Sequence, residues 1–168
     1  RLNLLVSQLY DGSVKRLGIV IDSDYIKDGG GFQRAVDQVS AALSAHGYSA
    51  TPRRMANSGL SFTHPDGLPD VGVWVMPDNS SEGAFEEWLS RTIHSSQLAL
   101  FQSAENSVQN IQNKLFPATH NKKAVTATWL AWQRKPGERA SYAFANNLLD
   151  IQSSSFSNFI NWLHTNFS

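Results

Sequence analysis

Residues 17–24 read Leu-Gly-Ile-Val-Ile-Asp-Ser-Asp, a short apolar run that is rich in β-branched residues and ends in two aspartates. Such a continuous run is typical of a strand that is buried on both faces of a parallel sheet. Three glycines follow at 29–31, then apolar residues at helical spacing from 32 to 43, with Gly47 as a helix stop. This order of strand, loop and helix predicts a βα unit.

A second apolar run lies at residues 71–76, Val-Gly-Val-Trp-Val-Met, and it too ends in turn residues, Pro-Asp-Asn-Ser-Ser at 77–81. Apolar residues at helical spacing follow over 84–93, with glutamates near the start of the expected helix, where the helix dipole favours acidic side chains. Between the two runs the pattern is weaker and predicts one short strand near residues 60–63. Strand, acidic turn and helix therefore occur twice.

The rest of the chain has helical character. We expect helices over residues 2–10, 98–114, 124–133 and 156–167, and no linker rich in Pro, Gly or Ser separates the later helices from the front half. The sequence thus predicts an α/β fold in one domain over residues 1–168, with a central, mostly parallel sheet flanked by helices and a helical C-terminal half. Trp129 and Trp132 lie at helical spacing beside Leu130, so we predict that they are core residues rather than a platform for stacked bases.

Composition excludes several classes of function. The 168 residues carry 14 Lys plus Arg and 14 Asp plus Glu, so the net charge is zero. This argues against a polybasic protein that coats nucleic acid and against a protein that binds anionic membranes. The chain has no Cys, which excludes disulfides, thiolate catalysis and zinc sites that use Cys. No apolar run approaches the ~20 residues that span a bilayer, and no signal-peptide pattern is present, so we expect a cytoplasmic protein without membrane contact.

Carboxylates stand where the two strongest strands end. Ligands bind at the carboxyl ends of strands in open α/β sheets, which selects Asp22, Asp24 and Asp78. Asp22 and Asp24 are two residues apart and in extended geometry point to the same side, where their charges repel unless a cation lies between them. Mg²⁺ is a suitable cation, because it usually binds one or two protein carboxylates and fills its other positions with water or substrate phosphates. The alternative is that these aspartates only shape turns.

Residues 19–24 resemble the strand with an Asp-x-Asp signature of the Toprim fold, which topoisomerases, primases and certain nucleases share. Further blocks resemble a small, largely uncharacterised prokaryotic group of stand-alone Toprim-like proteins. These blocks are 73–79 (Val-Trp-Val-Met-Pro-Asp-Asn), 120–124 (His-Asn-Lys-Lys-Ala), 128–133 (Thr-Trp-Leu-Ala-Trp-Gln) and 136–137 (Pro-Gly). Together they extend over most of the chain from residue 17 onward.

The resemblance implies Mg²⁺ held by Asp22 and Asp24, and a glutamate after the first strand that acts as general acid or base. Here the first glutamate is Glu82, and the chain opens at Arg1 without Met. Either the first strand and its glutamate lie upstream of Arg1, or the catalytic carboxylate is lost. Glu82 and Glu86 can replace it only if their helix N-terminus reaches Asp22. We predict Glu86 in the catalytic role, against the alternative of acids that merely favour a helix start.

Basic residues supply the remaining candidates. Relatives among the nucleases of this fold pair the metal with a lysine that neutralises charge on the phosphate, and Lys123 is the matching candidate here. We predict phosphate contacts of nucleic acid at Lys122, Arg53 and Arg54. The alternative for all four is a solvated surface.

Two functions are consistent with these residues. The first is a Mg²⁺-dependent protein of the Toprim type that cleaves a phosphodiester of nucleic acid or transfers a phosphoryl group. The second is a catalytically inactive Toprim-like module that binds nucleic acid or a protein partner. The sequence leaves open whether the chain associates with further copies of itself.

Overall fold

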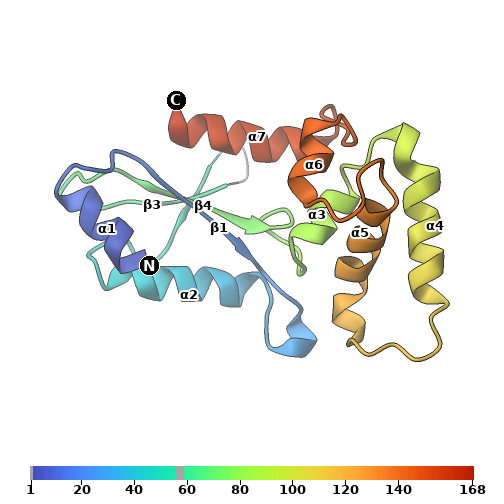
Figure 1. Ribbon diagram of the computed structural model, residues 1–168. Coiled ribbons are helices and arrows are strands. Elements are labelled where there is room, and N and C mark those ends of the chain that lie inside the picture. Colours follow the sequence, from blue (N-terminus) through green and yellow to red (C-terminus); the bar gives the residue numbers. More distant parts are fainter. Residues whose placement is uncertain (1, 56–58) are drawn as a thin grey trace. The chain divides into compact units, whose positions relative to one another are not determined.

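The computed structural model describes residues 2–55 and 59–168, in two compact units (Figure 1). The first unit holds Arg1–Phe85 together with Ser157–Ser168, and the second holds Glu86–Phe156. Two helices, α3 (Phe85–Ser90) and α7 (Ser154–Phe167), run across the boundaries between these residue ranges.

The first unit contains a mixed four-stranded sheet. Its strands are β1 (Leu17–Asp22), β2 (Arg53–Arg54), β3 (Leu60–Phe62) and β4 (Val71–Met76), and their order in the sheet is β1-β4-β3-β2. The α/β class is confirmed, as are the three strands expected from the sequence. In the described sheet only β1 and β4 pair in parallel, whereas β3 is antiparallel to both β4 and β2. The sheet is therefore mixed rather than mostly parallel.

The two apolar strands differ in burial. Every residue of β4 is buried, as the continuous apolar run predicts for a central strand. The same expectation is wrong for β1, which lies at the edge of the described sheet and leaves Val20 49% exposed. An apolar run alone does not distinguish a central strand from an edge strand, because the pairing partners come from elsewhere in the chain.

Helices cover both faces of the sheet (Figure 1). One face packs against α1 (Leu2–Tyr10) and α2 (Phe32–Ser44), and its core includes Val73, Val75 and Leu43, none of which is exposed. The other face packs against α7, where the Trp74 ring lies 5.8 Å from that of Trp162. Residues 71–76 alternate between these faces, as the two-residue period of a strand requires.

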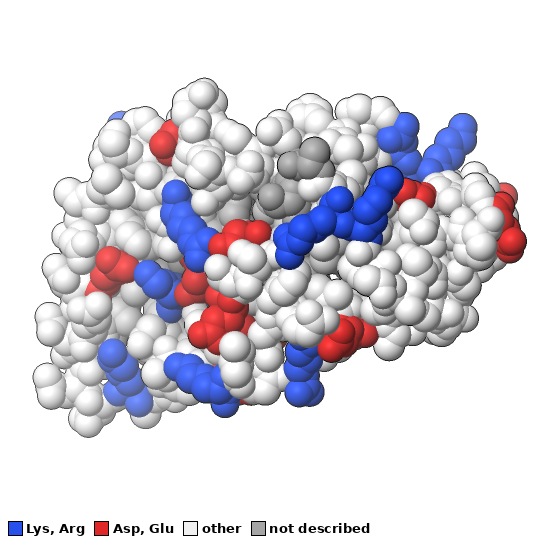
Figure 2. Space-filling model, turned by 180° about the vertical axis from the view of Figure 1, so that it is seen from behind, with Lys and Arg blue, Asp and Glu red and all other residues white. Residues whose placement is uncertain are grey.

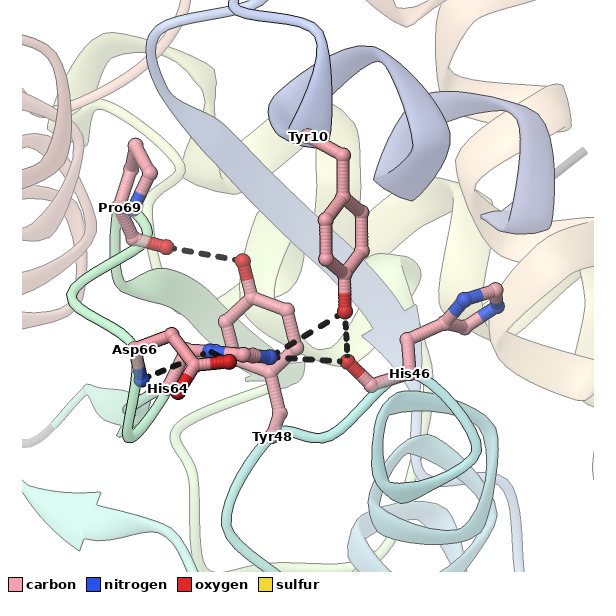
Figure 3. A network of polar contacts seen from close by, with 6 residues as sticks. All are labelled: Tyr10, His46, Tyr48, His64, Asp66 and Pro69. Carbon is pink, nitrogen blue, oxygen red and sulfur yellow. Dashed lines mark hydrogen bonds and ion pairs between the residues drawn. The ribbon is translucent and has the colours of Figure 1, made fainter.

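A polar network connects three segments at one end of the first unit (Figure 3). The hydroxyl of Tyr10, the last residue of α1, donates to the carbonyl of His46 and lies 3.2 Å from Nε2 of His64. Buried Tyr48 donates its hydroxyl to the carbonyl of Pro69 at 3.0 Å, and burial raises the pKa of this phenol. These contacts join α1, the segment after α2 and the β3–β4 connection.

The second unit is helical, as expected for the C-terminal half. Its regular elements are η2 (Ser95–Gln97), α4 (Leu98–Gln109), η3 (Ala118–His120), α5 (Asn121–Ala131) and α6 (Ala140–Ala145). Trp129 is fully buried, in agreement with its predicted core role, and its ring lies 5.8 Å from that of Phe101. Trp132 follows the last turn of α5 and is 44% exposed, so the prediction that it belongs to the core is wrong. Among the described residues, none of the helices has the length and apolar character needed to cross a bilayer.

Candidate functional site

Asp22 lies at the carboxyl end of β1, and the start of α3 reaches it. The main-chain N–H of Phe85, the first residue of α3, donates to Oδ1 of Asp22 at 2.9 Å. The next residue, Ser23, is buried and donates its hydroxyl to the carbonyl oxygens of Ser81 and Gly83, each at 3.0 Å. The loop after β4 is therefore fixed against the end of β1.

Asp24 is held against the same loop by its main chain. Its N–H donates to the carbonyl of Gly83 at 2.8 Å, and the N–H of Gly83 donates back at 3.0 Å. Asp24 has a φ of 56°, in the left-handed region that Asp tolerates better than most residues. The extended geometry assumed for the pair Asp22 and Asp24 therefore ends at Ser23. The side chain of Asp24 is exposed to solvent.

Glu82 is a third carboxylate in this part of the molecule. Its Oε2 accepts a hydrogen bond from the N–H of Ile26 at 2.7 Å, which joins the loop after β4 to the loop after β1. A glutamate near the start of α3 can act at this strand end only if the helix N-terminus reaches Asp22, and the Phe85 contact meets this condition. Within the first unit, Glu82 lies in the loop that contacts the end of β1. The catalytic role that the sequence favours for Glu86 stays a prediction.

Asp78 mainly organises its own turn. Its Oδ1 accepts from the N–H and the hydroxyl of Ser80 and from the N–H of Ser81, at 3.0, 2.8 and 2.7 Å. Its Oδ2 accepts from the hydroxyl of Ser81 at 2.8 Å. Three of these four hydrogen bonds reach Oδ1 and one reaches Oδ2, so Asp78 shapes the turn at 78–81. Its role as a metal ligand stays a prediction.

Arg53 and Arg54 are adjacent in β2 but face different surroundings. Arg54 donates from Nη2 to the carbonyl of Asn79 at 3.2 Å, and its guanidinium lies 5.6 Å from the centre of the Phe32 ring. Asn79 follows Asp78, so Arg54 lies beside the loop after β4. In Arg53, Nη2 lies 3.9 Å from Oδ2 of Asp70. Asp70 comes just before the first residue of β4, whereas Asn79 follows the last one. Of these two predicted phosphate ligands, only Arg54 lies beside the acidic loops.

Three predicted site residues belong to the second unit. Lys122 and Lys123 lie in the first turn of α5, where Nζ of Lys122 forms an ion pair with Oε1 of Glu105 at 3.0 Å. Lys123 is exposed, and Glu86 lies half-buried in the first turn of α3. The catalytic roles of Lys123 and Glu86 and the phosphate contact of Lys122 stay predictions.

The carboxylates of this part of the molecule suit a hard cation that takes few protein ligands. Among residues 2–55 and 59–168, no three His, Cys, Asp or Glu side chains come together as a metal cage. Mg²⁺ needs no such cage, because it commonly takes one or two carboxylates and keeps several waters. Carboxylates of both loops meet this description, with Asp24 and Glu82 exposed and Asp22 partly exposed. Figure 2 shows acidic side chains gathered close together on one face, with Lys and Arg side chains beside them.

Comparison with known proteins places the chain in a family. The family model of DUF3226, described as a protein of unknown function, matches residues 1–168. The chain belongs to this family. Comparisons with curated proteins and with solved structures gave no match. The chemistry of this DUF3226 chain must therefore be inferred from its own residues.

Proposed function

We propose that this DUF3226 chain is a Toprim-like, Mg²⁺-dependent protein that cleaves a phosphodiester of nucleic acid or transfers a phosphoryl group at the carboxyl end of β1. The observation that supports the proposal most is the hydrogen bond from the Phe85 N–H to Oδ1 of Asp22. It brings the loop after β4, with Glu82, to the strand end that carries Asp22 and Asp24. Open α/β sheets bind ligands at this kind of position.

The residues of the first unit fit Mg²⁺ by their chemistry. Asp22 and Asp24 would hold the ion, since both are carboxylates that solvent reaches at one loop junction. Asp78 is left out of this set because its oxygens hold the turn at 78–81. Bound Mg²⁺ would polarise an attacking water and neutralise charge that develops on the phosphate.

Other side chains have roles besides holding the ion. Glu82 stands in the loop that contacts β1 and is our candidate for accepting a proton from the attacking water, in place of the glutamate expected upstream. Arg54 holds its guanidinium beside the loop after β4 and is exposed, so it can bind a phosphate of the substrate. Charge stabilisation by Lys123 stays a prediction from the resemblance.

Substituting Asp24 tests the proposal directly. We expect Asp24→Asn to lower Mg²⁺-dependent cleavage of single- or double-stranded oligonucleotides by at least about 100-fold, since even groups that only support metal ligands are worth 10–100-fold. Asn tolerates the left-handed backbone of this position, so the loop should keep its shape.

The matched control is Asp37→Asn, which makes the same charge change on the exposed side of α2, where Asp37 accepts from Gln33. The control should cleave at the normal rate. Cleavage by Asp24→Asn at the rate of this control would contradict the proposal.

A specific observation supports a second function, an inactive Toprim-like module that binds nucleic acid or a protein partner. Asp22 and Asp78 both accept main-chain hydrogen bonds, as turn-forming aspartates do in proteins without a metal. Under this proposal the chain binds its partner equally well with Mg²⁺ and with a chelator, and it cleaves no oligonucleotide.

A further inference from the structure

A separate cavity lies at the opposite end of the strands, where β1 and β4 begin. It has a volume of about 340 Å³ and lies within the first unit. Lys15 and Arg16 come just before β1, and Asp70 comes just before β4, whereas Asp22 stands where β1 ends. The cavity is therefore distinct from the acidic loops, and a ligand can bind in it whether or not Mg²⁺ binds at the carboxyl end of β1.

On the side of α7, the wall of the cavity includes a close contact between Gly72 of β4 and Asn166 of α7. A Cβ atom at Gly72 would collide with Oδ1 of Asn166, so the glycine leaves room for the Asn166 side chain against β4. Asn166 is fixed by its Nδ2, which donates to the carbonyl of Trp162 at 2.8 Å, and by its carbonyl, which accepts from Nη1 of Arg16 at 3.2 Å. The strand and the helix thus hold Asn166 and Arg16 in place at the cavity.

The charge around the cavity is unbalanced. Among the described residues that line it, three are cations, Lys15, Arg16 and Arg53, and one is a carboxylate, Asp70. Asp70 already accepts from the Ser61 hydroxyl at 3.1 Å, and its 3.9 Å separation from Arg53 exceeds hydrogen-bond distance. The guanidinium of Arg53 is thus available to a ligand, and its side chain is 70% exposed.

We propose that this cavity binds a phosphate group. The guanidinium of Arg53 has the planar set of donors that matches phosphate oxygens, and the ammonium of Lys15 adds a point charge. Hydroxyls and an amide complete the wall, from Ser61, Thr165 and Asn166. The Ser61 and Thr165 hydroxyls already donate to Oδ2 of Asp70 and to the carbonyl of Asn161, whereas Nδ2 of Asn166 has a second N–H that can donate to a phosphate oxygen.

Substitutions with opposite charge effects test the site. The probe is inorganic phosphate, titrated at constant ionic strength and followed by amide chemical shifts of the full chain. We expect Arg53→Gln to weaken binding at least about fivefold, because it removes a charge-assisted contact. Asp70→Asn removes a carboxylate that repels phosphate and should strengthen binding about threefold.

An exposed arginine of α2 gives a matched control. Arg34→Gln makes the same charge change outside the residues that line the cavity, and phosphate binding at the cavity should keep its affinity. Equal weakening by the two arginine variants would overturn the proposal, as would the absence of saturable shifts at residues 15, 53 and 61. A weaker affinity in Asp70→Asn would overturn it too.

A competition experiment distinguishes two sources of the phosphate. A short single-stranded oligonucleotide is added to the phosphate-saturated chain. If the oligonucleotide displaces phosphate from the cavity at a concentration lower than that of the phosphate, the natural ligand is a nucleic-acid phosphodiester. Phosphate that stays bound identifies a small phosphorylated molecule. Both results require the phosphate site that Arg53 and Lys15 form.

Discussion

Replacing Gly30 by Ala should lower the free energy of unfolding by about 2–3 kcal/mol, since overpacking at a tight position costs about this much. A Cβ atom at Gly30 would lie 2.7 Å from Cβ of Asp24 and 2.7 Å from the carbonyl oxygen of Ser23. Both neighbours belong to the loop after β1, whose main chain is hydrogen-bonded to Gly83. Neither neighbour can therefore move away from the added methyl group without breaking these hydrogen bonds. Urea denaturation of the two proteins measures the loss.

Gly67→Ala is the control for this prediction. Gly67 has a φ of 75°, and none of the described neighbours would lie within 4 Å of the methyl group that Ala adds. Its substitution therefore costs only backbone strain, about 1 kcal/mol. A loss at Gly30 no larger than that at Gly67 would show that the loop after β1 is not packed as described. The contact between the two loops would then give no support to the proposed site.

Replacing Trp162 by Ala should have the largest effect on stability, a loss of about 3–5 kcal/mol. Trp162 is fully buried, and its ring stacks on Phe159 at 5.8 Å and contacts Trp74. Removing the indole leaves a cavity between α7 and the sheet that the neighbouring rings cannot fill. Thermal or urea unfolding measures the change.

Trp132→Ala serves as the comparison for Trp162→Ala. The Trp132 side chain is 44% exposed, and surface substitutions of this kind usually change stability by less than about 1 kcal/mol. Similar losses for the two tryptophans would contradict the packing of α7 on the sheet. That packing also forms the wall of the phosphate cavity, so this result would weaken the case for phosphate binding as well.

The sequence predicts the strands of this fold better than their pairing. The apolar runs at 17–21 and 71–76 identify β1 and β4 because burial selects such residues. In contrast, β2 consists of two exposed arginines, Arg53 and Arg54, which give no apolar signal. Because β2 and β3 pair in antiparallel, the sheet is mixed, and no local pattern in the chain specifies the direction of these pairings.

The candidate site is predictable in part. The rule for carboxyl ends of strands identifies Asp22, and the structure joins it to Phe85, which lies 63 positions further along the chain. The left-handed backbone of Asp24 cannot be predicted, because it depends on the pairing with Gly83. The position of Glu82 cannot be predicted from the sequence either, because it depends on the hydrogen bond that Glu82 accepts from Ile26 in the loop after β1.

Whether carboxylates at the end of β1 bind Mg²⁺ decides between the two proposed functions, and calorimetric titration of the full chain with Mg²⁺ measures this binding. Asp22→Asn is the decisive variant, because its amide oxygen can still accept from the Phe85 N–H while the charge is lost. Asp78→Asn is the matched control, since Asn can keep the main-chain hydrogen bonds of that turn.

We expect saturable binding that weakens at least about tenfold in Asp22→Asn and stays unchanged in Asp78→Asn. Absence of saturation up to on the order of 10 mM Mg²⁺, or equal affinity in Asp22→Asn and the unsubstituted chain, would contradict a magnesium site at this strand end. The aspartates would then be turn residues, and the chain would be better explained as a binding module.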